Sequence, residues 1–323
     1  MSGVRLATSI GGSLTIKNPV LTASGTCGYG LELEEFFDLS RIGGVVVKGL
    51  SMSPRAGNPP VRIVETPSGM LNAIGLQNIG VRAFLEEKLP VLRTKGTAVI
   101  ANIYGESVAE YRDVAGSLAG AQGLSGVEIN LSCPNTAQGG MAFGTDPRAV
   151  ESVTAAVKAA SRVPVMVKLT PNVTDITEIA RSAVAGGADS LSLVNTFVAM
   201  VVDVERRRPV LANASGGLSG PAIRPIAVWL VHQVARAVTV PVIGIGGITC
   251  GRDALEFLIA GASAVQVGTI VFADPASPAR IAAEIEAWCR DHGVTDIRSV
   301  IGSLELPARD GGRAEGPPKG CGE

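Results

Sequence analysis

Short runs of β-branched and other apolar residues alternate with alanine-rich stretches along most of this chain, and this alternation restricts the fold more than any other feature. Strands are expected at Val20–Ala23, Gly44–Lys48, Ala98–Ile103, Val127–Leu131, Val165–Leu169, Ser190–Val194, Val242–Ile245 and Ala264–Val267. Helix-like segments are expected at Val81–Leu89, Ser107–Ala119, Pro147–Ser161, Ile176–Gly186, Pro221–Ala237 and Cys250–Ala260. Strands joined by crossover helices pair in parallel and are buried on both faces, which explains their continuous apolar character.

Eight such units close most economically into a (β/α)8 TIM barrel, an α/β fold. An open doubly wound sheet is the alternative, but its nucleotide fingerprint is missing. Residues Gly244–Thr249 follow a strand without fitting G-x-G-x-x-G, and no acidic ribose ligand stands on a second strand. A chain of 323 residues has room for two ordinary domains or for one barrel. We therefore predict a single barrel domain over residues 1–305.

Three segments outside the strand–helix repeat have their own expected roles. The Gly11-Gly12 turn between short alternating runs predicts an N-terminal hairpin that plugs the bottom of the barrel. The connections over residues 50–95 and 195–220 are longer than a barrel requires, and long loops at the catalytic rim are usually functional. The tail, residues 306–323, is low in apolar content and is expected to be disordered.

Bulk composition excludes several classes of protein. A hydrophobic content of 46% supports a large core, and a net charge of −1 argues against nucleic acid as the main partner. The chain has no apolar run that could span a bilayer, and Met1–Leu6 lacks the apolar core of a signal peptide, so a cytoplasmic protein is expected. The cysteines show no metal-binding or disulfide spacing, so no metal or iron–sulfur site is expected on this chain. Those interpreted as packing residues are Cys27, Cys250 and Cys289.

The motif Asn130–Asn135 closes one of the expected strands and opens a glycine-rich loop, Gln138–Gly144. A thiol at the carboxyl end of a barrel strand, flanked by two amides and followed by a mobile cover, is where a barrel enzyme would carry a base or a nucleophile. The chain has only two histidines, so the commonest proton-transfer residue is scarce. Cys133 is therefore the first candidate, although an isolated cysteine is more often a buried core residue.

Glycines at the ends of the last strands predict a phosphate site. The seventh and eighth strands end in Gly246-Gly247 and Gly268-Thr269. Barrel loops at these positions commonly bind a phosphate through backbone N–H groups, and glycine permits close approach. Gly220, after the sixth strand, could add a third wall. Tight turns that pack a helix onto a strand are the alternative interpretation.

Lysines and amides at other strand ends extend this site. Lys48 and Lys168 each close an apolar run and would point their ammonium groups into the barrel mouth, where desolvation is costly without a partner. Solvated lysines are the alternative, but two facing one cavity favour an anionic ligand or a cofactor that becomes anionic on reduction. Four asparagines also stand at strand ends or in the long second loop, and they suggest a ligand with many hydrogen-bonding edges: Asn72, Asn102, Asn130 and Asn195.

Together these stretches resemble the catalytic subunits of class 1B dihydroorotate dehydrogenases, over residues 4 to about 305. The most specific segment is Glu65–Asn78, which reads ETPSGMLNAIGLQN. The other matched stretches are Ala23–Thr26, Val47–Gly49, Asn130–Asn135, Val167–Leu169, Val194–Thr196, Gly216–Pro221, Gly246-Gly247 and Val267–Thr269.

The resemblance implies one FMN over the barrel mouth, with dihydroorotate stacked on the flavin ring. The implied FMN-binding residues are Ser24, Lys48, Gly49, Asn102, Asn130, Lys168, Val194, Gly220, Gly246, Gly247, Gly268 and Thr269. The implied substrate-binding residues are Lys48, Asn72, Ala73, Ile74, Gly75, Leu76, Asn130, Asn195 and Thr196.

The same resemblance implies oxidation of (S)-dihydroorotate to orotate in de novo pyrimidine (UMP) biosynthesis. Cys133 would remove the C5 proton while the C6 hydride passes to flavin N5, which makes Cys133 and Lys48 the expected catalytic residues. A thiol base needs an accessible thiolate, which nearby lysines favour. Lys168 would offset negative charge on the reduced flavin, and the loop after Cys133 would act as a lid.

The resemblance further implies a partner chain. The wording of Ser68–Asn78 is similar to that of the NAD-linked class, in which electrons pass to a subunit holding FAD and a [2Fe–2S] cluster, and two catalytic chains join two such subunits in a heterotetramer. Membrane-associated relatives use serine as the base, whereas fumarate-linked class 1A relatives also use cysteine. The alternatives that stay open are a class 1A enzyme, a dihydropyrimidine dehydrogenase-like flavin domain, and a flavin-free phosphate-binding barrel isomerase or lyase.

Overall fold

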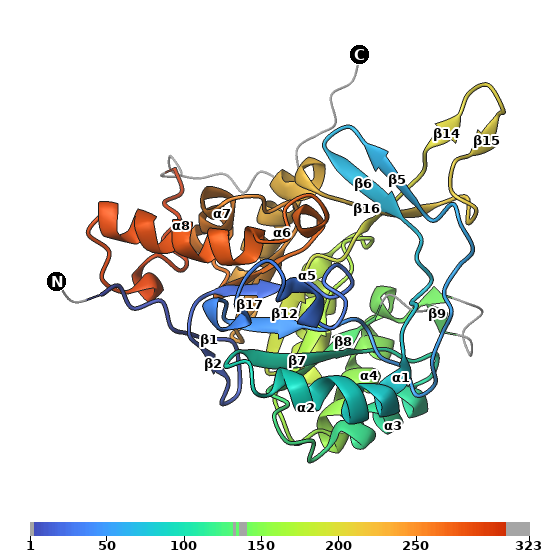
Figure 1. The fold of residues 1–323 in the computed structure, drawn as a ribbon, viewed down its shortest axis with the longest axis horizontal. Coiled ribbons are helices and arrows are strands. Elements are labelled where there is room, and N and C mark those ends of the chain that lie inside the picture. The colour runs from blue at the N-terminus through green and yellow to red at the C-terminus, as the bar shows by residue number, and fades with distance from the viewer. Residues whose placement is uncertain (1–2, 132–133, 136–140, 308–323) are drawn as a thin grey trace, which may run out of the picture.

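The computed structural model describes residues 3–131, 134–135 and 141–307. Within these residues eight parallel strands close into a barrel in the order β3-β4-β7-β8-β11-β12-β17-β18 (Figure 1). Their bounds are β3 Val20–Thr22, β4 Gly44–Val46, β7 Ala98–Ile103, β8 Gly126–Asn130, β11 Val165–Lys168, β12 Ser190–Leu193, β17 Val242–Ile245 and β18 Ala264–Val267. The predicted (β/α)8 barrel is confirmed, and each expected strand takes its place in it.

Helices cover the outside of the barrel (Figure 1). Side-chain caps begin several of them: Ser107, for example, accepts a hydrogen bond from the backbone N–H of Glu110. The helical elements are α1 Gly80–Ala83, a π-helical turn at Phe84–Lys88, α2 Leu89–Leu92, α3 Val108–Leu118, α4 Pro147–Ala160, α5 Ile176–Ala185, α6 Arg224–Ala237, α7 Gly251–Ala260 and α8 Ser277–Asp291. The sequence reasoning missed α8, although its buried residues Ile281, Ile285 and Cys289 recur at a helical spacing.

The predicted N-terminal hairpin closes the bottom of the barrel. It consists of β1 (Thr8–Ser9) and β2 (Thr15–Ile16), paired antiparallel. A Cβ on Gly11 would lie 2.2 Å from the backbone oxygen of Asp189, so only glycine permits this close approach. The hairpin contributes two isoleucines to an apolar cluster inside the barrel, made up of Ile10, Ile16, Leu21, Val46, Ile100, Met166, Ile243 and Ala264.

The two long rim loops pair with each other above the barrel mouth. They form an antiparallel sheet in the order β13-β16-β6-β5, with bounds β5 Ile63–Thr66, β6 Gly69–Asn72, β13 Phe197–Ala199 and β16 Gly216–Ser219. In the central pairing Leu218 of β16 lies opposite Leu71 of β6. Long functional loops were expected at these places, but their pairing was not, because local sequence patterns carry no signal for contacts between distant segments.

Beyond this sheet β14 (Val202–Asp203) and β15 (Arg208–Pro209) form an arm that projects from the barrel (Figure 1). Arg206 in this arm is exposed and pairs with Asp203.

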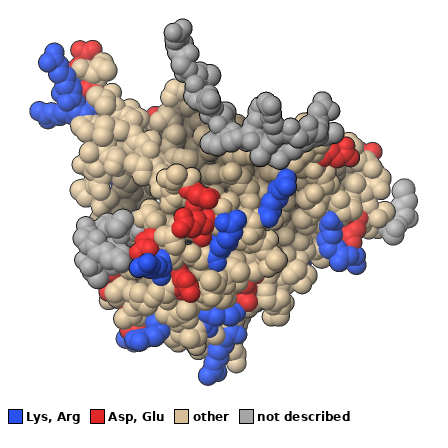
Figure 2. Space-filling model, turned by 180° about the vertical axis from the view of Figure 1, so that it is seen from behind, with Lys and Arg blue, Asp and Glu red and all other residues tan. Residues whose placement is uncertain are grey.

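Elsewhere on the face seen in Figure 2, acidic and basic side chains are interspersed. No helix in the described part of the chain is both long and apolar enough to cross a membrane. The predicted domain bounds stay a prediction, since 308–323 lie outside the described residues.

Candidate active site

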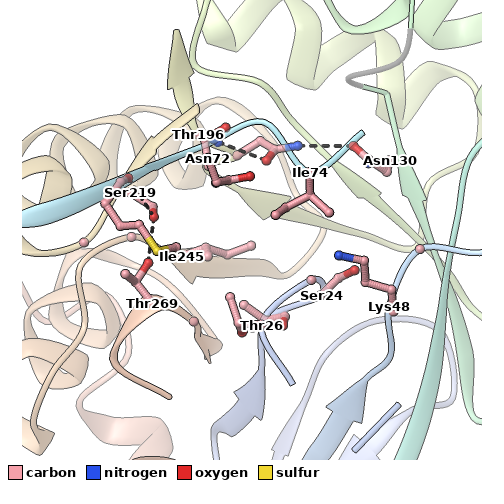
Figure 3. A pocket seen from close by; sticks show the side chains of 18 of the residues that line it. Ser24, Thr26, Lys48, Asn72, Ile74, Asn130, Thr196, Ser219, Ile245 and Thr269 are labelled. Atoms are coloured by element: carbon pink, nitrogen blue, oxygen red, sulfur yellow. Dashed lines mark hydrogen bonds between the residues drawn. The ribbon is translucent and has the colours of Figure 1, made fainter. Parts of the chain in front are cut away.

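A cavity of about 600 Å³ opens at the carboxyl ends of the barrel strands. This volume falls within the range of roughly 300–1,000 Å³ that is usual for small-molecule sites. Barrel residues, among them Lys48 and Lys168, line it. Asn72 of β6 and Ser219 of β16 bring the antiparallel sheet against it, across from Lys48 (Figure 3). The cavity therefore lies between the barrel mouth and the sheet built from the two rim loops.

With one exception, every site residue expected from the sequence lines this cavity. The exception is Cys133, which lies outside the described residues, as do residues 136–140 of the loop that follows it. The gathered residues are Ser24, Lys48, Gly49, Asn72, Ala73, Ile74, Gly75, Leu76, Asn102, Asn130, Lys168, Val194, Asn195, Thr196, Gly220, Gly246, Gly247, Gly268 and Thr269. Their proximity is a finding, whereas their individual roles stay predictions.

Sequence reasoning missed other residues that line the cavity. Thr26 and Ser219 belong to stretches that carried the resemblance, so a closer look at those stretches could have found them. Ile223, Ile245 and Phe272 belong to no motif, and only the fold brings them here. The further lining residues are Ala23, Gly25, Arg62, Ile63, Met70 and Gln77.

The glycines at one end of the cavity hold backbone in conformations that side chains disfavour. Gly247 has φ +67°, and a Cβ on it would lie 2.7 Å from the backbone oxygen of Gly220. Next to them, the Thr269 hydroxyl donates a 2.8 Å hydrogen bond to the Ser219 hydroxyl (Figure 3). This end of the cavity therefore offers bare backbone and hydroxyl groups, which suit a phosphate.

The two lysines expected at the barrel mouth both face the cavity without an ion pair to any described residue. Lys168 is the last residue of β11 and only 6% exposed. Figure 3 shows the Lys48 ammonium pointing into the cavity. Burial lowers the pKa of Lys48, because its ammonium loses water and gains no carboxylate in return. An anionic ligand would supply the missing countercharge.

Amide side chains at the cavity wall are fixed relative to one another. The Asn195 amide nitrogen donates to the Asn130 side-chain oxygen at 3.1 Å, and the Asn195 side-chain oxygen accepts from the Thr196 backbone N–H at 2.9 Å (Figure 3). Asn72 donates from its amide to the backbone oxygen of Gly217 at 3.2 Å. The wall thus presents polar groups in fixed directions, which favours recognition of a planar ligand with several hydrogen-bonding edges.

A buried polar cluster supports the segment that the sequence assigns to substrate binding. Asn78 donates from its amide to the backbone oxygen of Leu76 at 2.9 Å and to the Tyr104 hydroxyl at 2.7 Å. Ser51 joins the cluster through a 3.0 Å hydrogen bond to the same hydroxyl. Leu76 has φ +57°, an uncommon conformation for this residue type that the surrounding hydrogen bonds hold in place.

Cys27 behaves as the packing residue that the sequence predicted. Burial raises the pKa of its thiol from the ordinary 9.0 to about 11. We expect iodoacetamide at pH 8 to leave Cys27 unmodified in the folded protein and to modify it after denaturation, because the thiolate is the reactive form. Peptide mass mapping checks this result, with the partly exposed Cys250 as internal reference. Rapid labelling of Cys27 before denaturation would contradict its burial.

The same shift sets the direction of a pH effect on stability. The pKa of the folded-state thiol lies above that of the unfolded chain, so burial of Cys27 contributes stability that is fully present below about pH 9. This contribution is lost as the pH rises through about 11. Between about pH 9 and 11 the free energy of unfolding of a Cys27→Ala variant should therefore fall less than that of the wild type.

The barrel and its mouth define a (β/α)8 protein with a built site for a ligand that carries an anionic group. A family model for dihydroorotate dehydrogenase matches residues 5–288. Two proteins named dihydroorotate dehydrogenase B (NAD(+)), catalytic subunit, from Geobacter sp. (strain M21) and Trichlorobacter lovleyi, are each 56% identical to this chain; the matches cover 91% of it and 96% and 97% of those proteins. The chain therefore belongs to the dihydroorotate dehydrogenase family.

A solved structure shares the fold at much lower identity. The structure of DHODH from Eimeria tenella in complex with ferulenol has a TM-score of 0.77 and 23% identity, over 93% of this chain and 88% of that one. The resemblance based on the Glu65–Asn78 segment is confirmed by the family match and the close relatives, and with it the prediction of an oxidoreductase.

Proposed function

We propose that this protein oxidises (S)-dihydroorotate to orotate with FMN, in pyrimidine biosynthesis, and passes the electrons through a partner subunit to NAD. One observation carries the proposal: the residues that the sequence assigned to FMN and to substrate surround a single cavity. The relatives at 56% identity, which are named catalytic subunits of the NAD-linked enzyme, support the same conclusion.

The chain's own residues fit FMN at this cavity. The backbone at Gly246-Gly247 and Gly268 lines the cavity and suits the phosphate, since a glycine has no side chain to block close approach. Lys168 brings an ammonium without a carboxylate partner among the described residues, which suits a ring that gains negative charge on reduction. Asn102 adds a buried side-chain oxygen that has no hydrogen-bond partner among the described residues. These groups would hold the cofactor and stabilise its reduced form.

The amide wall fits dihydroorotate. Asn72, Asn130 and Asn195 would bind the edges of the pyrimidine ring, and Lys48 would pair with the substrate carboxylate. Because these amides are already fixed by hydrogen bonds, they would orient the substrate at little entropic cost. Bound FMN would supply the acceptor for the hydride that leaves C6.

Cys133 would take the C5 proton of the substrate as general base. This assignment rests on the sequence: Cys133 lies outside the described residues and stands three positions after Asn130, which ends β8 and lines the cavity. A thiolate there would be favoured by the ammonium groups of Lys48 and Lys168 at the same barrel mouth.

We also propose the partner and the assembly expected from the sequence. The electron-transfer subunit would hold FAD and a [2Fe–2S] cluster, and two such subunits would join two catalytic chains in a cytoplasmic heterotetramer. The words "catalytic subunit" in the names of the relatives support a second kind of chain.

An anaerobic absorbance spectrum, recorded before and after addition of dihydroorotate, tests the reaction. We expect the purified chain to carry a flavin band that bleaches with the substrate, because oxidation of dihydroorotate reduces the flavin. A flavin band that stays unbleached would contradict the substrate and redirect attention to another pyrimidine such as uracil. A protein that shows no flavin band after incubation with FMN and removal of the unbound FMN would contradict the cofactor and favour a flavin-free isomerase or lyase.

A further inference from the structure

A carboxylate is buried inside the barrel, one layer below the cavity. Glu128 lies on β8 and is 0% exposed. Its side-chain oxygens accept hydrogen bonds from Asn102 Nδ2 at 2.7 Å, Ser192 Oγ at 2.8 Å and Gln266 Nε2 at 2.6 Å. The donors come from β7, β12 and β18, and only β7 is a neighbour of β8 in the barrel, so these contacts cross the barrel interior.

The layers of the barrel place this network between the apolar plug and the ligand site. Met166 pairs with Glu128 in register and belongs to the apolar cluster at the bottom of the barrel. Asn130, two residues after Glu128 and therefore on the same face of β8, lines the cavity. A barrel interior is usually filled by bulky apolar side chains. The polar layer formed by Glu128 and its donors, directly under the ligand site, departs from this rule and points to a functional role.

Glu128 receives hydrogen bonds but no ion pair from the described part of the chain. Burial of a carboxylate is costly even when it is hydrogen-bonded, and an apolar side chain would avoid that cost. A carboxylate can fix the orientation of a hydrogen-bond donor side chain, which an apolar residue cannot do. Asn102 is the one donor of the three that also lines the cavity.

Asn102 has one donor end and one acceptor end. Its Nδ2 is held by Glu128, so its Oδ1 is the end left for other partners. Oδ1 is buried and has no hydrogen-bond partner in the described part of the chain. It lies beside Gly49, another lining residue: a Cβ on Gly49 would come within 2.9 Å of it. An orphaned acceptor at this place suits a ligand that brings an N–H group.

We propose that Glu128 is a positioning residue of the flavin site. From the layer below, it holds the Asn102 amide so that Oδ1 accepts a hydrogen bond from an N–H group of the bound isoalloxazine ring. Glu128 does not touch the ligand and acts through Asn102. The inference rests on the proposed function, because it takes FMN to be the occupant of the cavity.

Glu128→Gln tests this role with little change in shape. The new amide can donate to Asn102 as well as accept from it, so the Asn102 orientation is no longer fixed. We expect the dissociation constant of FMN to rise at least about tenfold. It is measured from the flavin fluorescence that is recovered when the FMN-loaded protein is diluted. Ser192→Ala is the matched control, since it removes another hydrogen bond to the same carboxylate and leaves Asn102 in place; its FMN affinity should stay within about threefold of the wild type.

A double-mutant cycle separates positioning from a general loss of structure. If Glu128 acts through Asn102, then Glu128→Gln should change FMN affinity by less than about twofold in an Asn102→Ala background. A full tenfold effect in both backgrounds would overturn the positioning role. Should Glu128→Gln fail to fold, Glu128→Met offers an apolar side chain of similar size, and the same cycle applies to it.

Two outcomes distinguish this inference from the proposed function. A wild-type chain that binds FMN, together with a folded Glu128→Gln variant of unchanged FMN affinity, would overturn the inference and leave the proposed function standing. A wild-type chain that binds no FMN would overturn both.

Discussion

Cys133→Ala should keep its FMN and lose at least about a hundredfold in the rate at which dihydroorotate reduces the flavin. A positioned general base typically contributes a factor of this size or more. Apart from Asn130, the residues proposed to hold FMN, such as Lys168 and Gly247, belong to other strands and loops, so cofactor binding should persist. Anaerobic stopped-flow absorbance of the flavin band measures the rate directly, apart from any later electron transfer to a partner.

Two further variants sharpen this test. Cys133→Ser should retain more activity than the alanine variant, with its optimum at higher pH, because a hydroxyl ionises less readily than a thiol. Cys250→Ser is the matched control: Cys250 caps α7, and serine is a good capping residue, so flavin reduction should remain at the wild-type rate. Flavin reduction by Cys133→Ala at close to the wild-type rate would sink the assignment of Cys133 as base.

Lys168→Met should weaken FMN binding by about tenfold or more and lower the reduction potential of the flavin that remains. Lys168 is nearly buried at the floor of the cavity, and the described residues provide it with no ion pair. We therefore expect its charge to act mainly on the bound ligand, and more strongly on a reduced flavin than on an oxidised one. A tenfold preference for the reduced form corresponds to about 30 mV for a two-electron couple.

Equilibration of the bound flavin with a reference dye measures that potential, and dilution measures the affinity. Methionine keeps the length of the lysine stem, so the loss of charge is tested rather than the loss of packing. Lys95→Met is the control, since Lys95 pairs with Glu34 and does not line the cavity. An unchanged potential and an unchanged FMN affinity in Lys168→Met would refute the electrostatic role.

The barrel was predictable because each of its strands leaves a local signal. A run such as Val242–Ile245 is apolar throughout, and the structure begins and ends the strand at the same residues. The rim sheet left no comparable signal. Asn72 and Gly217 meet although 145 residues separate them, and only the closed barrel brings their loops together. Pairing of this kind is a property of the fold rather than of either segment.

Some residues of the candidate site could likewise be predicted from the sequence, and others could not. Lys48, Lys168 and the paired glycines stand at strand ends, where a parallel barrel must bring its polar groups together, so the sequence indicated them. Glu128 stands inside the expected strand Val127–Leu131, where the apolar pattern indicates burial and no chemical role. A charged residue at an inward position of such a strand is a usable signal, but its meaning depends on Asn102, which lies on a neighbouring strand.

The rim sheet joins the two halves of the ligand site into one mechanical unit. β6 carries Asn72 of the expected substrate wall. Its partner β16 ends at Ser219, which is hydrogen-bonded to Thr269 at the end of the cavity proposed for the phosphate. A ligand bound at this end of the cavity would therefore also restrain β6, the strand against which the substrate would lie. If FMN binds here as proposed, part of the free energy of its binding would go into ordering the rim sheet.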